Sequence, residues 1–291
     1  MKPARFDFVR AESVGQAIEA LAQAGSDAKV LAGGQSLLPM MNFRLVKPSV
    51  LVDINQICGL DAVSEEGTKL SLGALVRHRV TAEHSLIARR VPVLHQAMKH
   101  VAHLTVRNRG TFCGSLCHAD PSAEIPMLTL LLDGVLNVVS RRGSRSLPAK
   151  DFFLRALVTA LAPDELVKGV ELTIPDPDAG WGFEEFARRH GDYALGGVAV
   201  ILSRRAGRVE HARMAVMGVS ETPLRVYAVE ESLNGRPFSD ASVDDAVEIL
   251  RGSVTPMSDM NASAEYRRHL VGALARRALA AAWSRAKESV L

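Results

Sequence analysis

The chain has few of the features that would assign it to a specialised class of protein. Its three cysteines among 291 residues follow no disulfide spacing. No apolar run approaches the roughly 20 residues of a membrane span, and the N-terminus MKPARFDFVR lacks the apolar core of a secretory signal. The net charge is only +3, and the basic residues form no concentrated tract. We therefore expect a cytoplasmic protein without a membrane span or a nucleic-acid partner.

The composition is that of a folded chain with a proper core. Hydrophobic residues make up 47% and charged residues 23% of the sequence. The length allows two domains, or one domain with an appendage. The sequence therefore permits a sizeable enzyme or binding module.

The segment from Val30 to Phe43, VLAGGQSLLPMMNF, is the first informative stretch. It begins as the end of a buried strand and continues into two glycines. Gly33 and Gly34 can adopt left-handed conformations, and consecutive N–H groups in such a turn can converge on an anionic oxygen. Ser36 can add a hydroxyl hydrogen bond. An ordinary strand-to-helix turn has the same sequence pattern, so a phosphate site is one of two interpretations.

A second stretch, TVRNRGTFCGSLCHADPSAEIP over residues 105–126, predicts another loop of small residues. These small residues are Gly110, Thr111, Gly114 and Ser115. Asp120 follows them, and Glu124 lies in the first turn of a helix expected over 125–132. Carboxylates are good acceptors for ribityl or ribose hydroxyls. Two separate small-residue loops therefore suit a dinucleotide, which has two phosphates and a sugar between bulky ends.

A metal site is the competing interpretation of this second stretch. Cys113, Cys117 and His118 lie within six positions, but they supply too few ligands for a closed zinc site. Five further histidines between residues 77 and 104 match no compact ligand motif. Buried cysteine commonly behaves as a small hydrophobe. We therefore expect no metal ligands in this chain.

Hydrophobic periodicity predicts mixed secondary structure. In the N-terminal part we expect a helix that begins at Ser13, with Gln16 completing a capping box and Gly25 as the C-terminal cap. Strands are expected over 6–9, 49–54 and 69–73, and mostly helix over 77–104. Near the C-terminus we expect strands over 183–187, 197–203 and 211–219, and helices over 224–233, 243–250 and 264–287.

Four segments together resemble the FAD-binding medium subunit of molybdenum hydroxylases, a family that includes aerobic carbon monoxide, xanthine, nicotine and caffeine dehydrogenases. In order, these segments are AGGQSLLPMMNFRL, RNRGTFCGSLCHADPSAEIP, FARRHGDYALGGVAV (Phe186–Val200) and SAEYRRHL (Ser263–Leu270). The similarity covers essentially the whole chain. Cys113 departs from the family, which usually has glycine there. We expect its thiol to point into an apolar pocket, with Gly114 taking any unusual backbone angle.

The resemblance implies an α+β fold in two domains. A two-lobed FAD-binding domain of the PCMH/vanillyl-alcohol-oxidase type would cover residues 1–175, with lobes of about 1–56 and 57–175. A smaller C-terminal domain with an antiparallel sheet and helices would cover 181–291. The turn-favouring run PDPDAG at 175–180 marks the expected boundary.

The resemblance also implies the function. FAD, bound without a covalent bond, would receive electrons from iron–sulfur clusters and pass them to an external acceptor. The implied cofactor-binding residues are Leu31, Ala32, Gly33, Gly34, Gln35, Ser36, Leu37, Gly110, Thr111, Gly114, Ser115, Asp120, Glu124 and Tyr193. Tyr193 would lie against the isoalloxazine ring, although a core aromatic at a strand start is equally compatible. None of these residues is expected to act as an acid, base or nucleophile.

The implied partners are two further subunits. A small subunit would carry [2Fe–2S] clusters, and a large subunit would bind molybdopterin and oxidise the organic substrate. The three would form a heterotrimer that dimerises. Two alternatives remain at the level of sequence: a stand-alone FAD-dependent reductase or oxidase of the same superfamily, and a flavin-free assembly module.

Overall fold

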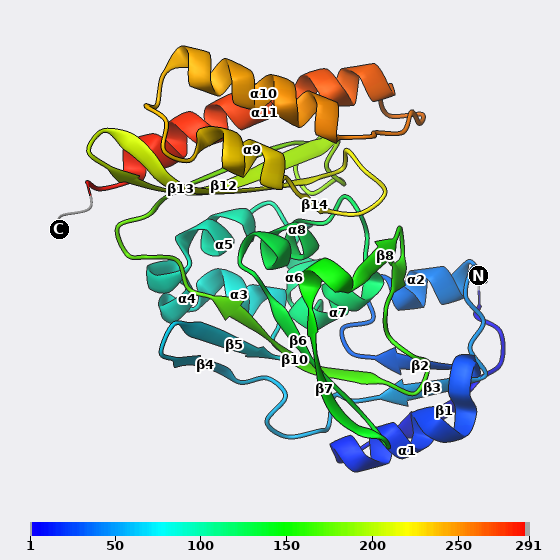
Figure 1. Cartoon of the computed structure of the whole chain (residues 1–291). Coiled ribbons are helices and arrows are strands. Elements are labelled where there is room, and N and C mark those ends of the chain that lie inside the picture. Colours follow the sequence, from blue (N-terminus) through cyan, green and yellow to red (C-terminus); the bar gives the residue numbers. More distant parts are fainter. Residues whose placement is uncertain (1, 289–291) are drawn as a thin grey trace.

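The computed structural model describes residues 2–288 and contains three sheets of three or more strands (Figure 1). The first sheet is parallel, in the order β1-β3-β2. Its segment comprises β1 (Asp7–Arg10), α1 (Val14–Ala24), η1 (Gly25–Asp27), β2 (Ala28–Leu31), α2 (Leu37–Asn42) and β3 (Val50–Asp53). All three strands therefore end at the same edge of the sheet, where the first glycine segment follows β2.

Helix α1 begins and ends at the residues that the sequence predicts. The Ser13 side chain accepts the N–H of Gln16 at 3.2 Å, and Gly25 ends the helix with a φ of 56°. The Gln16 side chain accepts the N–H of Glu12, at 2.7 Å, instead of the N–H of Ser13. The reciprocal bond of the expected capping box is therefore displaced by one residue.

The second sheet is antiparallel, in the order β4-β5-β10-β6-β7. Its strands are β4 (Val63–Glu66), β5 (Lys69–Gly73), β6 (Val135–Ser140), β7 (Gly143–Pro148) and β10 (Leu166–Thr173). The chain between β5 and β6 forms α3 (His78–Glu83), α4 (Ser85–Arg90), α5 (Pro92–Ala97), α6 (Leu104–Arg107), α7 (Phe112–His118) and α8 (Glu124–Leu131). Between β7 and β10 lie η2 (Ala149–Asp151), β8 (Phe153–Arg155) and β9 (Val158–Thr159).

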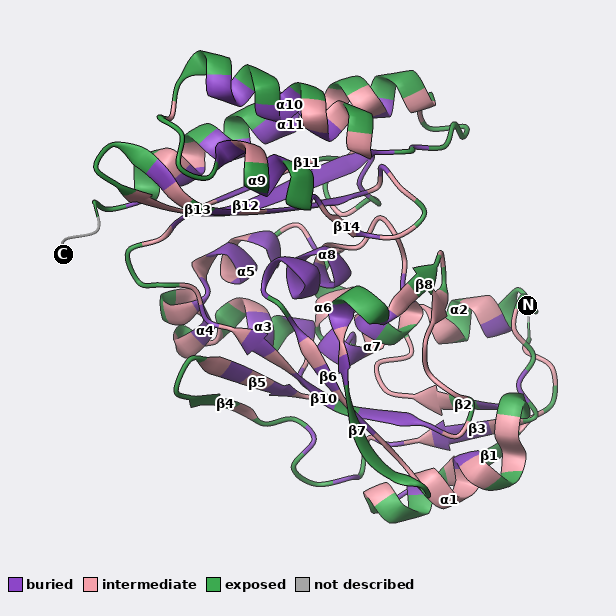
Figure 2. Cartoon of the chain, in the orientation of Figure 1, coloured by how far each residue is buried: buried purple, intermediate pink, exposed green. Residues whose placement is uncertain are grey.

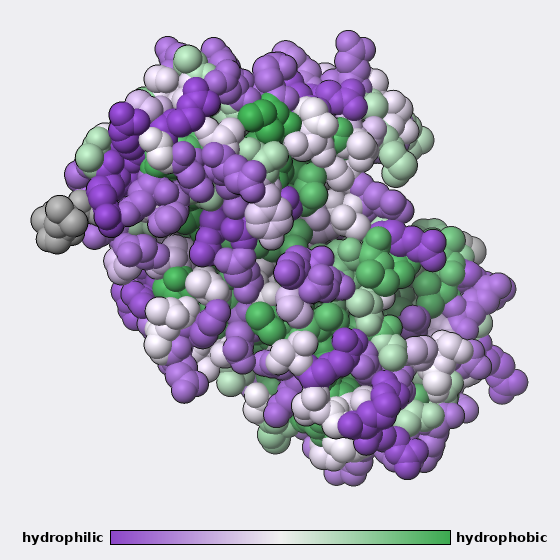
Figure 3. Space-filling model, viewed as in Figure 1, coloured by the Kyte–Doolittle hydropathy of each residue, from purple (hydrophilic) through white to green (hydrophobic). Residues whose placement is uncertain are grey.

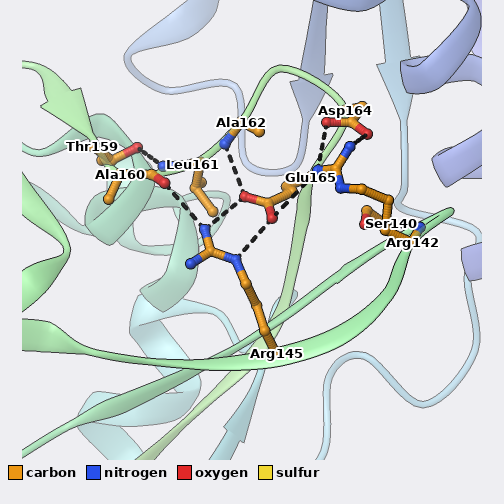
Figure 4. A network of polar contacts seen from close by, with 9 residues as sticks. All are labelled: Ser140, Arg142, Arg145, Thr159, Ala160, Leu161, Ala162, Asp164 and Glu165. Atoms are coloured by element: carbon orange, nitrogen blue, oxygen red, sulfur yellow. Dashed lines mark hydrogen bonds and ion pairs between the residues drawn. The ribbon is translucent and has the colours of Figure 1, made fainter.

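A polar network holds the outer strand β7 to the turn before β10 (Figure 4). Two nitrogens of Arg145 each donate to a Glu165 carboxylate oxygen at 2.8 Å, and the N–H of Ala162 also donates to Glu165. The hydrogen bond from Arg145 lowers the pKa of Glu165. Since the Arg145 side chain is partly exposed, we interpret this pair as a structural contact that fixes the edge of the second sheet.

The third sheet is antiparallel, in the order β11-β12-β13-β14. Its segment comprises β11 (Gly180–Phe186), β12 (Gly196–Arg205), β13 (Arg208–Met217), β14 (Leu224–Arg225), α9 (Tyr227–Leu233), α10 (Asp240–Ser253) and α11 (Ala264–Arg285). Helices α9–α11 cover one face, and α5 and α8 lie beneath the other (Figures 1 and 2). The sheet is therefore a middle layer between two groups of helices.

Alternating side chains of β12 enter two different cores, as the two-residue period of a strand requires. Val198, Val200 and Leu202 pack with the helices above, whereas Ala199 and Ile201 join the core below. Residues 125–131 of α8 are all buried because this helix packs against the third sheet and also against α7 and η2. The sheet therefore rests directly on the segment that contains Glu124.

The mixed α+β class and the antiparallel C-terminal sheet are confirmed. The helix expected over 224–233 is wrong at its start, because Leu224 and Arg225 pair with β13 as the short strand β14. Apolar side chains gather on the surface over α2 and β8 (Figure 3), where Leu38 and Leu154 are exposed. No helix within residues 2–288 combines the length and apolar composition needed to cross a membrane.

Candidate functional site

The first glycine segment forms a row of free backbone donors. Strand β2 ends at Leu31 and α2 begins at Leu37. Within the part of the chain that the structure describes, the amide N–H groups of residues 32–37 donate to no protein acceptor. Gly34 has a φ of 71°, in the left-handed region that favours glycine. The Ser36 side chain makes no capping bond. This segment therefore has the donors of an anion-binding nest.

The second segment differs from the predicted loop, because Gly114 and Ser115 lie in the first turn of α7. Thr111 caps this helix, and its side chain accepts the N–H of Gly114 at 3.1 Å. Gly114 has an ordinary backbone angle, so the expectation that it takes an unusual one is wrong. A Cβ atom at Gly114 would lie 2.5 Å from Thr111 Oγ1. Glycine is therefore required there to make room for the cap.

Cys113 occupies the second position of α7 with no left-handed backbone angle. Its side chain is buried, with Sγ 4.0 Å from the carbonyl oxygen of Gly73, and burial raises the pKa of the thiol. The expected orientation into the core is thus confirmed. Its backbone N–H, however, has no protein acceptor among residues 2–288. This amide was not predicted, because the residue type at position 113 says nothing about the partner of its backbone N–H.

The two segments lie directly against each other. A Cβ atom at Gly33 would lie 2.4 Å from the carbonyl oxygen of Arg109. Glycine at position 33 therefore makes room for the chain that leads into Gly110 and Thr111. The segments that carry the unpaired amides are therefore in direct contact at Gly33 and Arg109.

Asn55 and Arg77 connect these two segments, and sequence analysis missed both. Asn55 Nδ2 donates to the carbonyl oxygen of Ala32 at 2.9 Å. Arg77 donates one hydrogen bond to Asn55 Oδ1 at 2.7 Å and another to the carbonyl oxygen of Arg109 at 2.5 Å. Desolvation, followed by the charge of Arg109, lowers the pKa of Arg77. The position of Asn55, directly after the strand predicted over 49–54, was the one feature of the sequence that could have indicated its role.

Two carboxyl groups follow α7 in the chain, at Asp120 and Glu124. Asp120 Oδ1 accepts the N–H of Ser122 at 2.8 Å, which fixes the turn before α8. Glu124 is the first residue of α8, and desolvation raises its pKa to about 7. Desolvation, followed by the charges of Asp120 and Glu124, also raises the pKa of Tyr193. These shifts place Asp120, Glu124 and Tyr193 in one neighbourhood.

Tyr193 lies in the connection between β11 and β12. Its relative exposure is 66%, so the core-aromatic alternative is wrong. Nearby, a Cβ atom at Gly191 would lie 2.5 Å from the His103 ring, and Gly191 has a φ of 87°. The segment that contains Tyr193 therefore packs against the turn before α6.

The segment SAEYRRHL, at the start of α11, contacts the connection between β11 and β12. Arg267 on α11 is buried and donates to the carbonyl oxygens of Leu195 and Gly218, at 2.7 and 3.2 Å. The N–H of Gly218 in turn donates to the carbonyl oxygen of Pro121 at 2.8 Å. The segments SAEYRRHL and GDYALGG thus meet beside the Asp120 turn, although they are far apart in sequence.

Cys113, Cys117 and His118 of the second stretch lie in different environments. Cys113 is buried, whereas Cys117 is exposed on the same short helix. Burial lowers the pKa of His118, although the charge of Asp120 opposes this effect. Residues 2–288 contain no group of three or more His, Cys, Asp or Glu side chains positioned to hold a metal ion.

Comparisons with known proteins agree with this geometry. Residues 4–177 match the family described as the FAD binding domain in molybdopterin dehydrogenase, and residues 181–282 match the CO dehydrogenase flavoprotein C-terminal domain. The 6-hydroxypseudooxynicotine dehydrogenase complex subunit alpha of Paenarthrobacter nicotinovorans is 39% identical over 290 residues, which cover 99% of this chain and 97% of that protein.

Solved structures show the same relationship. A chain of carbon monoxide dehydrogenase from Hydrogenophaga pseudoflava superposes with a TM-score of 0.96 at 36% identity, covering 99% of this chain and 100% of its own. A chain of quinoline 2-oxidoreductase from Pseudomonas putida 86 has a TM-score of 0.93 at 38% identity, covering 99% and 100%. The chain therefore belongs to the family of FAD-binding medium subunits of molybdenum hydroxylases, which are oxidoreductase complexes.

Proposed function

We propose that residues 31–37 and 110–115 bind the pyrophosphate of FAD. The observation that carries this proposal is the row of amide N–H groups at 32–37 without a protein acceptor among the described residues. The backbone N–H of Cys113, at the start of α7, likewise has no protein acceptor among the described residues. Aligned backbone donors at a nest and a helix start are suited to an anion. The residues present therefore fit a diphosphate ligand.

The carboxyl side suits the sugar-like part of the cofactor. Asp120 and Glu124 offer acceptors for ribityl hydroxyl groups, which backbone amides cannot provide. The exposed ring of Tyr193, next to these carboxyls, offers an aromatic surface for the isoalloxazine ring. The amide side and the acid side together match two successive parts of FAD, the pyrophosphate and the ribityl chain with its isoalloxazine ring.

When bound, FAD would supply two-electron redox chemistry, and the chain would supply binding and orientation. We assign no residue of this chain as a general acid, base or nucleophile. We propose that electrons arrive from [2Fe–2S] clusters on a small partner subunit and leave to an external acceptor. A large partner subunit with the molybdenum cofactor would oxidise the organic substrate. Two relatives, one named as the subunit alpha of a dehydrogenase complex and the other as the medium chain of a carbon monoxide dehydrogenase, support a multi-subunit assembly.

We further propose a heterotrimer that dimerises in the cytoplasm, with a FAD-binding domain over 1–175 and a C-terminal domain over 181–291. The lobes of the first domain would divide near residue 56, between the parallel and the first antiparallel sheet. The run of turn-favouring residues at 175–180 supports the boundary between domains. The separate family matches, which end at 177 and begin at 181, fall at the same run.

The experiment that tests the proposal is flavin analysis of the purified full chain. We expect yellow protein with a flavin spectrum, and acid precipitation should release all the colour into the supernatant as FAD. Colour retained in the pellet would contradict non-covalent binding. A colourless apo-protein that does not bind added FAD would favour the flavin-free module. Reduction by a small organic substrate without partner subunits would favour the stand-alone enzyme.

A further inference from the structure

The first turn of α11 contains a buried arginine whose hydrogen bonds leave the helix. Arg267 is only 6% exposed. Its guanidinium donates to the carbonyl oxygen of Leu195 at 2.7 Å and to that of Gly218 at 3.2 Å. A buried charge is costly unless it is paired and hydrogen-bonded. Arg267 therefore depends on two loops of the third sheet for its acceptors, and it fixes the positions of those loops in return.

A carboxylate on the other side of Arg267 fixes the orientation of the guanidinium. Asp259 Oδ2 accepts from the other terminal nitrogen of Arg267 at 2.8 Å, and Oδ1 accepts the N–H groups of Asn261 and Ala262 at 2.8 and 3.0 Å. Hydrogen bonds from the N–H groups of Ala262 and Asn261 lower the pKa of Asp259, so it is ionised at neutral pH. The planar fork of arginine can serve a carboxylate and two carbonyl oxygens together.

The first of these carbonyl oxygens belongs to the connection that contains Tyr193. Leu195 lies two residues after Tyr193, and its N–H donates to the carbonyl oxygen of Phe186 at 2.8 Å. At its other end the connection packs against the His103 ring through Gly191. Arg267 therefore fixes the end of a short loop from which the tyrosine ring extends into solvent.

The second carbonyl oxygen belongs to the turn after β13. Gly218 has a φ of 74°, and a Cβ atom there would lie 3.2 Å from the carbonyl oxygens of Ala194 and Leu195. Glycine therefore lets this turn lie against the connection between β11 and β12. The N–H of Gly218 donates to the carbonyl oxygen of Pro121, the residue after Asp120. Hydrogen bonds thus connect Arg267 through Gly218 to the turn that contains Asp120.

We propose that Arg267 is a positioning residue, which fixes the Tyr193 connection and the Asp120 turn relative to each other. This inference rests on the proposed FAD site, in which Tyr193 lies against the isoalloxazine ring and Asp120 accepts from the ribityl chain. Among the described residues, the hydrogen bonds of the Arg267 side chain go to Leu195, Gly218 and Asp259, and none goes to residues 31–37 or 110–115. Loss of Arg267 should therefore affect the ring half of FAD and spare the pyrophosphate half.

The first test needs no ligand. Lysine at position 267 keeps the charge, but its compact ammonium group lacks the fork that serves all three acceptors. Hydrogen exchange of the full-length apo-protein should therefore be about tenfold faster in Arg267→Lys at the amides of Leu195 and Gly218, equivalent to about 1.4 kcal/mol. Unchanged exchange at both amides overturns the proposal, whether or not FAD binds.

The second test compares the binding of FAD and ADP to the full-length apo-protein. ADP has the pyrophosphate but neither the ribityl chain nor the ring. For Arg267→Lys we expect FAD to bind about tenfold more weakly and ADP to bind within about twofold of wild type. Equal losses for both ligands would indicate a general loss of structure, and no loss for either would show that Arg267 has no positioning role. Both results overturn the proposal. Failure of the wild type to bind either ligand refutes the proposed function, while hydrogen exchange still decides whether Arg267 fixes the two loops.

Asp259→Asn is a second variant for the case in which Arg267→Lys fails to fold. The Asp259 side chain is 47% exposed, and an asparagine oxygen can still accept the N–H groups of its own turn. Arg267 loses its charged acceptor, so we expect the same selective loss of FAD affinity with a smaller magnitude. Wild-type exchange and wild-type FAD affinity in this variant would contradict the proposal.

Arg276→Lys is the matched control. Arg276 lies on the same helix, and its exposed side chain pairs with Asp244 of α10. Exposed pairs contribute little. We expect wild-type hydrogen exchange at Leu195 and Gly218, and wild-type affinity for both ligands.

Discussion

The two sides of the candidate site differ in the groups that they offer. Residues 32–37 and 113 present backbone N–H donors, which carry no titratable proton in the physiological range. Asp120 and Glu124 present carboxyl groups, and the pKa of Glu124 is raised. The amide side depends on backbone shape and should be insensitive to pH, whereas the acid side depends on protonation. Substitutions on the two sides should therefore fail in different ways.

The largest effect is expected from Gly34→Val on the amide side. A β-branched residue at a φ of 71° is strained by roughly 1–3 kcal/mol. Its Cβ atom would also lie 3.0 Å from the Leu38 side chain and 3.1 Å from that of Leu31. We expect the row of amides to lose its arrangement and FAD binding to be abolished, without unfolding of the chain. Flavin content and circular dichroism, measured together, check this outcome.

Gly67→Val is the control for backbone strain. Gly67 also has a positive φ, 57°, but a Cβ atom there meets nothing within 4 Å. This variant should lose stability and keep its FAD. Full FAD occupancy in Gly34→Val would show that residues 31–37 do not bind the pyrophosphate.

A smaller loss is expected from Arg77→Ala, which removes the connection between the two amide segments. The carbonyl oxygen of Arg109 and Oδ1 of Asn55 would each lose a charged donor. Hydrogen bonds to charged groups contribute about 1.5–3 kcal/mol, so we expect FAD to bind at least roughly tenfold more weakly. Titration of apo-protein with FAD measures this loss of affinity, which we expect to be the same at every pH.

Arg79→Ala provides the comparison. Arg79 lies two residues further along and forms an exposed pair with Glu83 at 3.0 Å. Exposed pairs of this kind contribute little, so FAD affinity should be unchanged. Equal affinity for Arg77→Ala and Arg79→Ala would show that the connection does not position the loops.

The buried carboxyl group of Glu185, on β11, should make the stability of the chain depend on pH. The pKa of Glu185 is raised in the folded chain from 4.5 to about 8, mainly by desolvation. Because the folded value exceeds the unfolded one, this group's contribution is complete below pH 4.5 and is lost as the pH rises through about 8. Wild type should therefore lose stability relative to Glu185→Gln across this window. Urea unfolding midpoints of both proteins at each end of the window test the sign, and a constant difference would contradict it.

The smallest effect is expected from Cys113→Ala. The thiol is buried and neutral, and the backbone N–H of this residue is the group that has no protein acceptor among the described residues. FAD affinity should change by less than about tenfold, and likewise in Cys113→Gly, although glycine in a helix costs about 1 kcal/mol of stability. A larger change in the alanine variant would assign a direct role to the thiol.

Some parts of the site could be predicted from the sequence, and others could not. Residues 31–37 are contiguous, so a strand followed by two glycines was enough to locate the amide side. The helical position of Gly114 was not foreseen, because a run of small residues has the same composition in a loop and in a capped helix turn. Asn55 and Arg77 were missed because their partners lie 23 and 32 residues away along the chain.

The sequence by itself determined the local features of this protein: the alternation of strands and helices, the left-handed turn at Gly34, and the four segments that mark its family. Tertiary structure decided which of these features meet. Packing of α11 on β11 and β12 brings Arg267 to the carbonyl oxygen of Leu195, across 72 residues of chain. Local patterns depend on neighbours within a few residues, whereas burial, and with it the protonation of Glu185, exists only after distant elements have excluded water.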